Sequence, residues 1–185
     1  MQDDYVGNIE EEFDDEFQTG IVALMYKDLK FLAYASDNLK TNYFSDRDLA
    51  WIFSAVKHHY VDTRSLISER AIKDRLRGDI KRGSLDKDRI SFIRSIFKKI
   101  DDDSLSDAGY IQDRVVSFVK KNLMKEAFIR ATDSYQRGNY AEIVSVFTDA
   151  YKKADIVFKS GQTYPDTEGF DERIKRRSVT RRVVP

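Results

Sequence analysis

The sequence predicts an all-α protein: a compact helical bundle, then a long antiparallel helical hairpin, then a linker segment. Only 2 prolines and 8 glycines occur among 185 residues, too few for the frequent tight turns of β proteins. Apolar residues recur at helical spacing along most of the chain. Charged residues make up 35%, which suits slender helices with a large exposed surface. We expect an acidic arm at 1–16, the bundle at 17–103, the hairpin at 104–158 and the linker at 159–185.

Three helices are predicted in the first half of the bundle. Phe17–Lys27 places its apolar side chains on one face, and the pattern continues, after a break, through Asp28–Asp37. Asn38–Phe44 is a predicted loop that ends in an aromatic pair. Ser45 is the expected N-cap of the helix Asp46–Tyr60, because a serine hydroxyl accepts a hydrogen bond from the free amides of a first turn.

Two further helices complete the bundle. Ser68 and Gly78 have the residue types that begin and end a helix, which predicts Glu69–Arg77. Apolar residues at helical spacing predict Asp86–Ile100. The run Asp101–Asp103 should end the bundle, because three adjacent carboxylates cannot be buried without partners.

The hairpin is predicted from two long helices joined by a very short turn. One helix should run from Asp107 to about Arg137 and the other over Tyr140–Phe158, with the turn at Gly138-Asn139. Helices joined so closely must be antiparallel. At 1.5 Å per residue the first arm would reach roughly 45 Å.

The first arm carries more apolar surface than one partner helix can cover. The second arm has a single stripe: Ile143, Val146, Phe147, Ala150, Tyr151, Ala154, Val157 and Phe158. The first arm has two patches on roughly opposite sides, one made of Ile111, Val115, Phe118 and Val119 and the other of Met124, Phe128, Ala131 and Tyr135. One patch should meet the second arm, and the other should meet either the bundle or another copy of the chain. The candidate oligomer interface is therefore Ile111, Val115, Phe118, Val119, Met124 and Phe128.

No catalytic, cofactor-binding or metal-binding residues are expected. Lys40-Thr41 and Lys159-Ser160 lack the glycines of a phosphate loop. His58 and His59 are adjacent and cannot share a helix face as a metal pair. Asp101–Asp103 lacks the glycine and terminal glutamate of a calcium loop. We therefore expect a protein that is not an enzyme.

The charge distribution is balanced overall and polarised at the ends. The formal net charge is +0, and there are no cysteines. An acidic N-terminus and the absence of an apolar run of ~18 residues argue against a signal peptide and a membrane span, so we expect a cytoplasmic protein. Residues 1–16 carry acids and no Lys or Arg, whereas 173–185 carry bases and no acid. Each end is either solvated or meets an oppositely charged surface in an assembly.

The order of these features resembles the N-terminal domain of the DnaB-family replicative DNA helicases, most of all the phage-type branch. The motifs that carry the resemblance are Phe17-Gln18, Ile21–Met25, Asp28, Phe31-Leu32, Tyr43-Phe44 and Asp46–Tyr60, followed by the hairpin Asp107–Phe158. The end of the chain, with ERIKRR and then Val183-Val184-Pro185, looks like the approach to the helicase motor.

This resemblance implies an assembly and docking role. Such domains form a collar in which hairpins of neighbouring subunits pair, so the partners would be further copies of the chain (a hexameric ring in the full-length protein), a primase and a helicase loader. Single-stranded DNA would be contacted at most indirectly. Phe170, Ile174 and Arg177 would dock the linker on the next subunit. ATP and Mg²⁺ would be needed only by a motor domain that these residues do not contain, in a bacterial or phage-infected cell.

The alternative is a free-standing helical protein that binds nucleic acid or regulates through its basic C-terminal tail. Arg173–Arg182 would then neutralise several phosphates, and binding would weaken steeply with salt. Removal of residues 171–185 separates the two hypotheses, because DNA affinity is lost only if the tail is the binding element.

Overall fold

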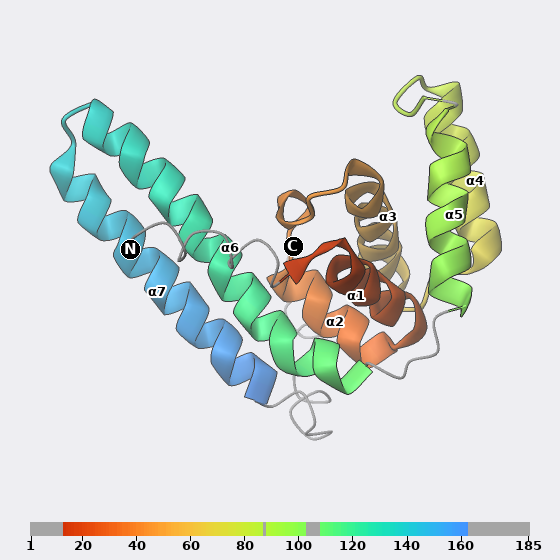
Figure 1. Ribbon diagram of the computed structural model, residues 1–185, viewed down its shortest axis with the longest axis horizontal. Helices are drawn as coiled ribbons and strands as arrows, with labels where there is room; N and C mark the ends of the chain where they lie inside the picture. The colour runs from red at the N-terminus through yellow and green to blue at the C-terminus, as the bar shows by residue number, and fades with distance from the viewer. Residues whose placement is uncertain (1–12, 87, 103–107, 163–185) are drawn as a thin grey trace, which may run out of the picture. The chain divides into compact units, whose positions relative to one another are not determined.

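The structure, a computed structural model, describes residues 13–86, 88–102 and 108–162 (Figure 1). These residues form α-helices and one short 3-10 helix, with no strand among them, which confirms the all-α prediction. The elements are α1 (Asp15–Lys27), α2 (Leu29–Asn38), η3 (Thr41–Tyr43), α3 (Arg47–Thr63), α4 (Glu69–Lys81), α5 (Arg89–Asp102), α6 (Ala108–Gln136) and α7 (Tyr140–Gln162).

The chain divides into two compact units, Met1–Phe118 and Val119–Pro185. The division falls inside α6 and not near residue 103, where the run of aspartates was expected to end the first unit. Helix α5 continues through Asp101 and Asp102. The first unit also extends into α6, because the N-terminal turns of that helix carry large apolar side chains that are buried within it.

Asp28 separates α1 from α2, at the predicted break. Its backbone is extended, with φ −120° and ψ 112°, and its N–H donates to the Leu24 carbonyl at 2.8 Å, which closes α1. Its carboxylate accepts hydrogen bonds from the backbone N–H groups of Lys30 at 2.7 Å and Phe31 at 3.1 Å. One residue thus caps both helices, because aspartate satisfies free first-turn amides well.

The N-cap of α3 is Asp46, so the prediction of Ser45 was wrong by one residue. The Asp46 carboxylate accepts from the N–H groups of Asp48 and Leu49 at 2.7 and 2.8 Å. Ser45 instead binds backwards to α1: its N–H donates to the buried Gln18 side chain at 2.8 Å, and its hydroxyl donates to Asp15 at 2.9 Å. These hydrogen bonds tie the segment that contains Tyr43 and Phe44, just before α3, to helix α1.

Helix α4 begins where predicted, with the Ser68 hydroxyl accepting from the Ala71 N–H at 3.2 Å. It does not end at Gly78 but continues to Lys81. The helix continues because Ile80 adds to its apolar face and Asp79 finds a partner on α3. The left-handed turn comes later, at Gly83 with φ 69°.

Phe118 forms the centre of an aromatic cluster in the first unit. Its ring lies 5.4 to 6.4 Å, centroid to centroid, from four other rings, those of Phe13, Phe17, Tyr43 and Phe44. Such tilted and edge-to-face contacts add to the gain from burial alone. This cluster joins the predicted aromatic pair before α3 to both α1 and the start of α6.

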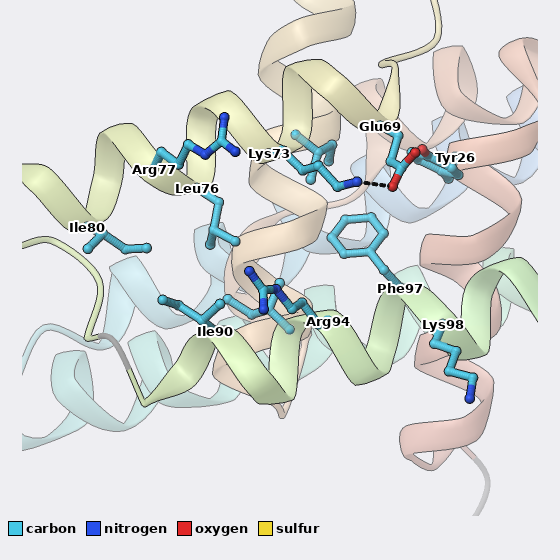
Figure 2. Close-up of a pocket in the computed structure, with 12 residues that line it drawn as sticks. Tyr26, Glu69, Lys73, Leu76, Arg77, Ile80, Ile90, Arg94, Phe97 and Lys98 are labelled. Carbon is cyan, nitrogen blue, oxygen red and sulfur yellow. Dashed lines mark ion pairs between the residues drawn. The ribbon is translucent and has the colours of Figure 1, made fainter.

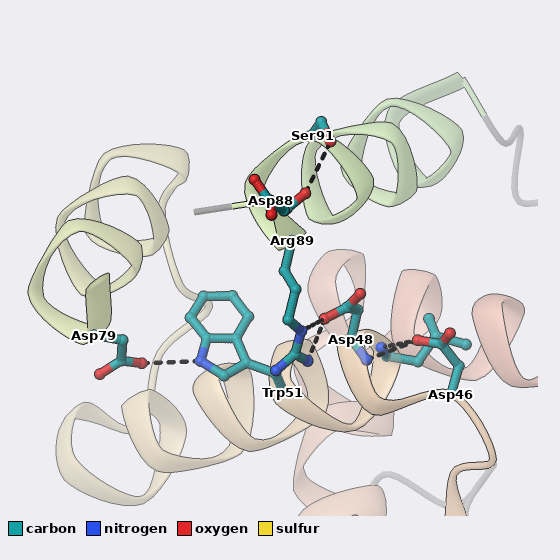
Figure 3. Close-up of polar contacts among 8 residues, drawn as sticks. Asp46, Asp48, Trp51, Asp79, Asp88, Arg89 and Ser91 are labelled. Carbon is teal, nitrogen blue, oxygen red and sulfur yellow. Dashed lines mark hydrogen bonds and ion pairs between the residues drawn. The ribbon is translucent and has the colours of Figure 1, made fainter. Parts of the chain in front are cut away.

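Helices α4 and α5 flank an open groove (Figure 2), and each is joined to α3 by a polar contact (Figure 3). The Trp51 indole N–H donates to Asp79 of α4 at 2.9 Å. The Arg89 guanidinium of α5 pairs with the nearly buried Asp48 carboxylate. Two separate contacts to α3 therefore set the positions of the helices on either side of the groove.

In the second unit α6 and α7 form a helical hairpin, which we define as residues 119–162. Gly138, with φ 71°, supplies the left-handed residue of the predicted turn. The Asn139 side chain accepts from the Glu142 N–H at 3.4 Å and donates to the Glu142 carboxylate at 3.0 Å, which begins α7. Ala127, Val146 and Ala150 form the buried core between the arms.

Replacement of Phe118 by Ala should destabilise the first unit by about 3–5 kcal/mol, the usual cost of removing a buried aromatic ring. Urea unfolding followed through Trp51, the single tryptophan, measures the loss. Phe128→Ala is the matched control, because Phe128 lies on the same helix and is exposed; its effect should stay below about 1 kcal/mol. Equal effects of the two variants would contradict the packing described.

The hydrogen bond between Trp51 and the Asp79 carboxylate should make part of the free energy of unfolding depend on pH. Burial alone would raise the pKa of Asp79, but hydrogen bonds from Trp51 and Arg82 and the charges of Arg82 and Arg75 lower it below the ordinary 3.8. The stabilisation is therefore complete above the ordinary pKa and is lost as pH falls through the lowered native value. Asp79→Ala should cost about 1–3 kcal/mol at pH 7, and the difference from the wild type should shrink below pH 3.8.

Urea midpoints measured from pH 7 to pH 2.5 test this dependence. Asp74→Ala serves as the control, since that carboxylate is exposed and pairs with Arg77 of the same helix, at 3.3 Å. A stability difference for Asp79→Ala that stays constant with pH would show that its charge does not contribute.

Candidate functional site

The first of the two predicted patches on α6 lies inside the first unit. Ile111, Val115 and Phe118 are buried there, and Val119 is buried as well. Ile111 packs so closely on α1 that a Cβ added at Gly20 would lie 2.5 Å from its Cδ1 atom. Of the two alternatives left open by the sequence, contact with the chain's own bundle is therefore the one observed. These four residues are buried within the chain itself, and their assignment to an oligomer interface stays a prediction.

The second patch divides between the inside and the outside of the hairpin. Ala131 is buried and Met124 is half-buried against the core between the arms. Phe128 and Tyr135, by contrast, are 63% and 65% exposed. Of the six predicted interface residues, Phe128 is thus the one that lies largely in solvent.

The seam between α6 and α7 consists mostly of small side chains. Its buried residues are Leu123, Ala127, Ala131, Ser134, Val146, Ala150 and Ala154. Such small side chains cover little apolar area on their neighbours, although Phe147 packs partly against this core. The large apolar residues of the hairpin must therefore lie beside the seam.

These large residues gather on one face of the hairpin. On α7, Tyr140, Val144, Phe147 and Tyr151 follow one another at spacings of four, three and four residues. Because successive residues of a helix are rotated by about 100°, these spacings place the four side chains on the same side of α7. Ring contacts join the arms on this face: Phe128 lies 5.1 Å from Phe147, and Tyr135 lies 5.9 Å from Tyr140. We name this surface the aromatic face; it comprises Phe128, Tyr135, Tyr140, Val144, Phe147 and Tyr151.

The exposure of the aromatic face distinguishes it from the first unit. Apart from the half-buried Phe147, its members are 63–70% exposed, whereas the exposed large hydrophobic residues of the first unit reach only 37–52%. The side of the hairpin turned away from this face carries charged residues: Glu126, Arg130, Asp133, Arg137, Glu142, Asp149 and Lys153. Exposed large apolar residues are therefore concentrated on one side of the hairpin, and Ile129 and Ile156 are the exposed ones that lie outside the aromatic face in the part of the hairpin that the structure describes.

The size of the aromatic face matches that of a protein interface. A whole aromatic side chain presents about 150–250 Å², so the exposed parts of these six residues amount to roughly 600–800 Å². A standard stable interface takes about 800 Å² from each partner. Monomeric proteins rarely expose a contiguous apolar patch of this size without using it.

The sequence pattern contained the signal for this face, but it was read as a single stripe. Tyr151 and Phe147 were grouped with the seam residues of α7, and Tyr140 and Val144 were not singled out. The spacing of Tyr140, Val144, Phe147 and Tyr151 is itself a second helical stripe, offset from the alanines. The two stripes on α7 become distinct when the positions of its alanines and of its large apolar residues are compared separately.

The other predicted site features are accounted for as follows. Phe170, Ile174 and Arg177 lie outside the described residues. His58 and His59 make local contacts with Ser54 and Ser65. Within the described ranges, acidic and histidine side chains do not gather in a group of three that could hold a metal ion. In the same part of the chain, none of the helices combines the length and apolarity needed to cross a membrane.

Comparison of the chain with protein-family models, with curated proteins and with solved structures gives no match. The resemblance to the DnaB N-terminal domain therefore stays a prediction made from the sequence motifs. The geometry of the hairpin is the independent observation from which a function can be argued.

Proposed function

We propose that this chain is a non-catalytic assembly and partner-docking module that associates with further copies of itself through the aromatic face. The observation that carries the proposal is the set of exposed aromatic side chains on one side of the hairpin, opposite a charged side. Burial of this surface would contribute about 25 cal/mol per Å² before the costs of association are counted.

A second copy is the occupant that the aromatic face suits best. The face is made of like residues from both arms, so two copies related by a two-fold axis can place the same patch against itself. Four of its six members are separated by heptad-like steps along α7, and such repeats favour packing of helix against helix. Tyr135, Tyr140 and Tyr151 keep a hydroxyl that can remain hydrated at the rim of the interface.

The biological setting of the proposal comes from the sequence resemblance. As the N-terminal domain of a DnaB-family replicative helicase, the module would help to assemble the helicase ring and recruit a primase and a helicase loader. Pairing of hairpins is the kind of contact that such a collar needs. The assignment to replication rests on the sequence motifs between Phe17 and Tyr60, the hairpin pattern Asp107–Phe158 and the end of the chain, whereas self-association is argued from the exposure of the aromatic face.

Val144→Asp should weaken self-association at least about tenfold, which corresponds to 1.4 kcal/mol. The change places a carboxylate in the apolar centre of the aromatic face, and in a two-fold dimer it places two of them close together. Sedimentation equilibrium of the full chain between about 1 and 100 µM measures the effect, and we expect the wild type to form dimers or larger assemblies in this range.

Ile156→Asp is the matched control. Ile156 lies on the same helix and is 64% exposed, close to the 70% of Val144, but it points away from the aromatic face. It should leave association unchanged. A wild-type chain that stays monomeric at 100 µM, or equal effects of the two substitutions, would refute self-association through this surface.

A further inference from the structure

The groove between α4 and α5 is a second surface with the properties of a binding site. It encloses about 650 Å³. Its floor is aliphatic: Ile72, Leu76 and Ile93 are buried, and Ile80 and Ile90 are half-buried. Figure 2 shows Leu76 and Ile80 of α4 opposite Ile90 and Phe97 of α5, with the head groups of Arg77 and Lys98 at the outer margins of the groove. This surface belongs to the first unit and shares no residue with the aromatic face.

Basic side chains surround the aliphatic floor. Lys73 and Arg77 of α4 and Arg94 and Lys98 of α5 line the groove, against a single acid, Glu69. The local formal charge of the lining is therefore four minus one, or +3, in a chain whose net charge is +0. A concentration of one sign of charge around an apolar floor favours a ligand of the opposite sign.

The ion pairs already present at the groove can be exchanged. Glu69 pairs with Lys73, and Asp74 pairs with Arg77 at 3.3 Å, but all four side chains are exposed. Exposed pairs of this kind contribute at most about 1 kcal/mol. Arg94 and Lys98 have no ion-pair partner among the side chains that the structure describes. An incoming carboxylate could thus bind at little cost.

We infer that this groove binds an amphipathic helix of a partner protein in which acidic residues flank an apolar stripe. The groove extends along α4 from Glu69 to Ile80, which at 1.5 Å per residue is about 17 Å and matches a helix of about three turns. Leucines or isoleucines at spacings of three and four would lie on the aliphatic floor, as in other helix-in-groove complexes. Asp or Glu beside them would meet the basic rim.

Single-stranded nucleic acid is the other anionic ligand to consider, and the floor disfavours it. Sequence-tolerant binding of single strands needs aromatic rings on which bases stack. The aromatic residues here are Tyr26 and Phe97, and their rings already pack against one another at 5.8 Å. The remaining floor is aliphatic, which suits leucine and isoleucine side chains and not bases.

The test uses the full chain and a labelled 14-residue peptide with leucines at positions i, i+3, i+4, i+7 and i+11 and glutamates beside them. Fluorescence anisotropy should show binding that weakens as salt rises from 50 to 300 mM. Arg94→Glu should reduce the affinity at least tenfold, and a peptide with lysine in place of glutamate should not bind. Arg70→Glu, an exposed change on α4 outside the groove lining, should have no effect.

Other outcomes would overturn the inference. Binding of both peptides alike would show that charge plays no part. Stronger binding of a thymidine dodecamer, lost in Arg94→Glu, would identify a nucleic-acid site. The sedimentation of Arg94→Glu should match the wild type, so this inference and self-association can fail separately.

Discussion

The small side chains that form the buried core of the hairpin are the constraint on which its exposed surface depends. Ala127, Ala131, Ala150 and Ala154 are buried in the hairpin, and each offers only a methyl group to a neighbouring side chain. Phe147 packs against this core, but the core covers little of the other large side chains, so most of their apolar area is not buried within the hairpin itself. The helices keep those rings on one side, where they contact one another in pairs and remain mostly in solvent. A hairpin stabilised by its own large side chains would have no such surface to offer.

Helix α6 satisfies two different packing requirements along its length, and the sequence indicated this but could not assign the partners. Periodicity shows which residues share a face of a helix, but it does not show what covers that face. Of the two patches predicted on α6, the first is buried as a group, whereas the second divides between buried and exposed residues. The first is covered by the bundle because rings contributed by α1 and the segment before α3 surround Phe118. That arrangement joins residues about 100 positions apart in the sequence, and no local pattern contains it.

The helix ends show a similar division between local and tertiary information. Asp28 and Ser68 cap helices where their residue types predict, since capping depends on a few neighbouring backbone groups. Serine is also a favourable N-cap residue, but Ser45 is hydrogen-bonded to Gln18 and Asp15 of α1. Asp46 is therefore the residue that caps α3. Gly78 would end an isolated helix, yet the bond between Trp51 and Asp79 lies just beyond it. The groove beside α4 was missed for the same reason, because its walls are set by contacts to α3.

The two exposed surfaces differ in chemistry, and this difference determines how each would respond to its surroundings. The aromatic face is uncharged, so association through it depends on the area removed from water and changes little with ionic strength. The groove combines an aliphatic floor with a basic rim, so binding there includes an electrostatic part that salt screens over about 10 Å at 0.1 M. An assembly held by the first surface can therefore stay intact under conditions that release a partner from the second. A module that keeps its copies together while it exchanges partners needs this separation of the two kinds of contact.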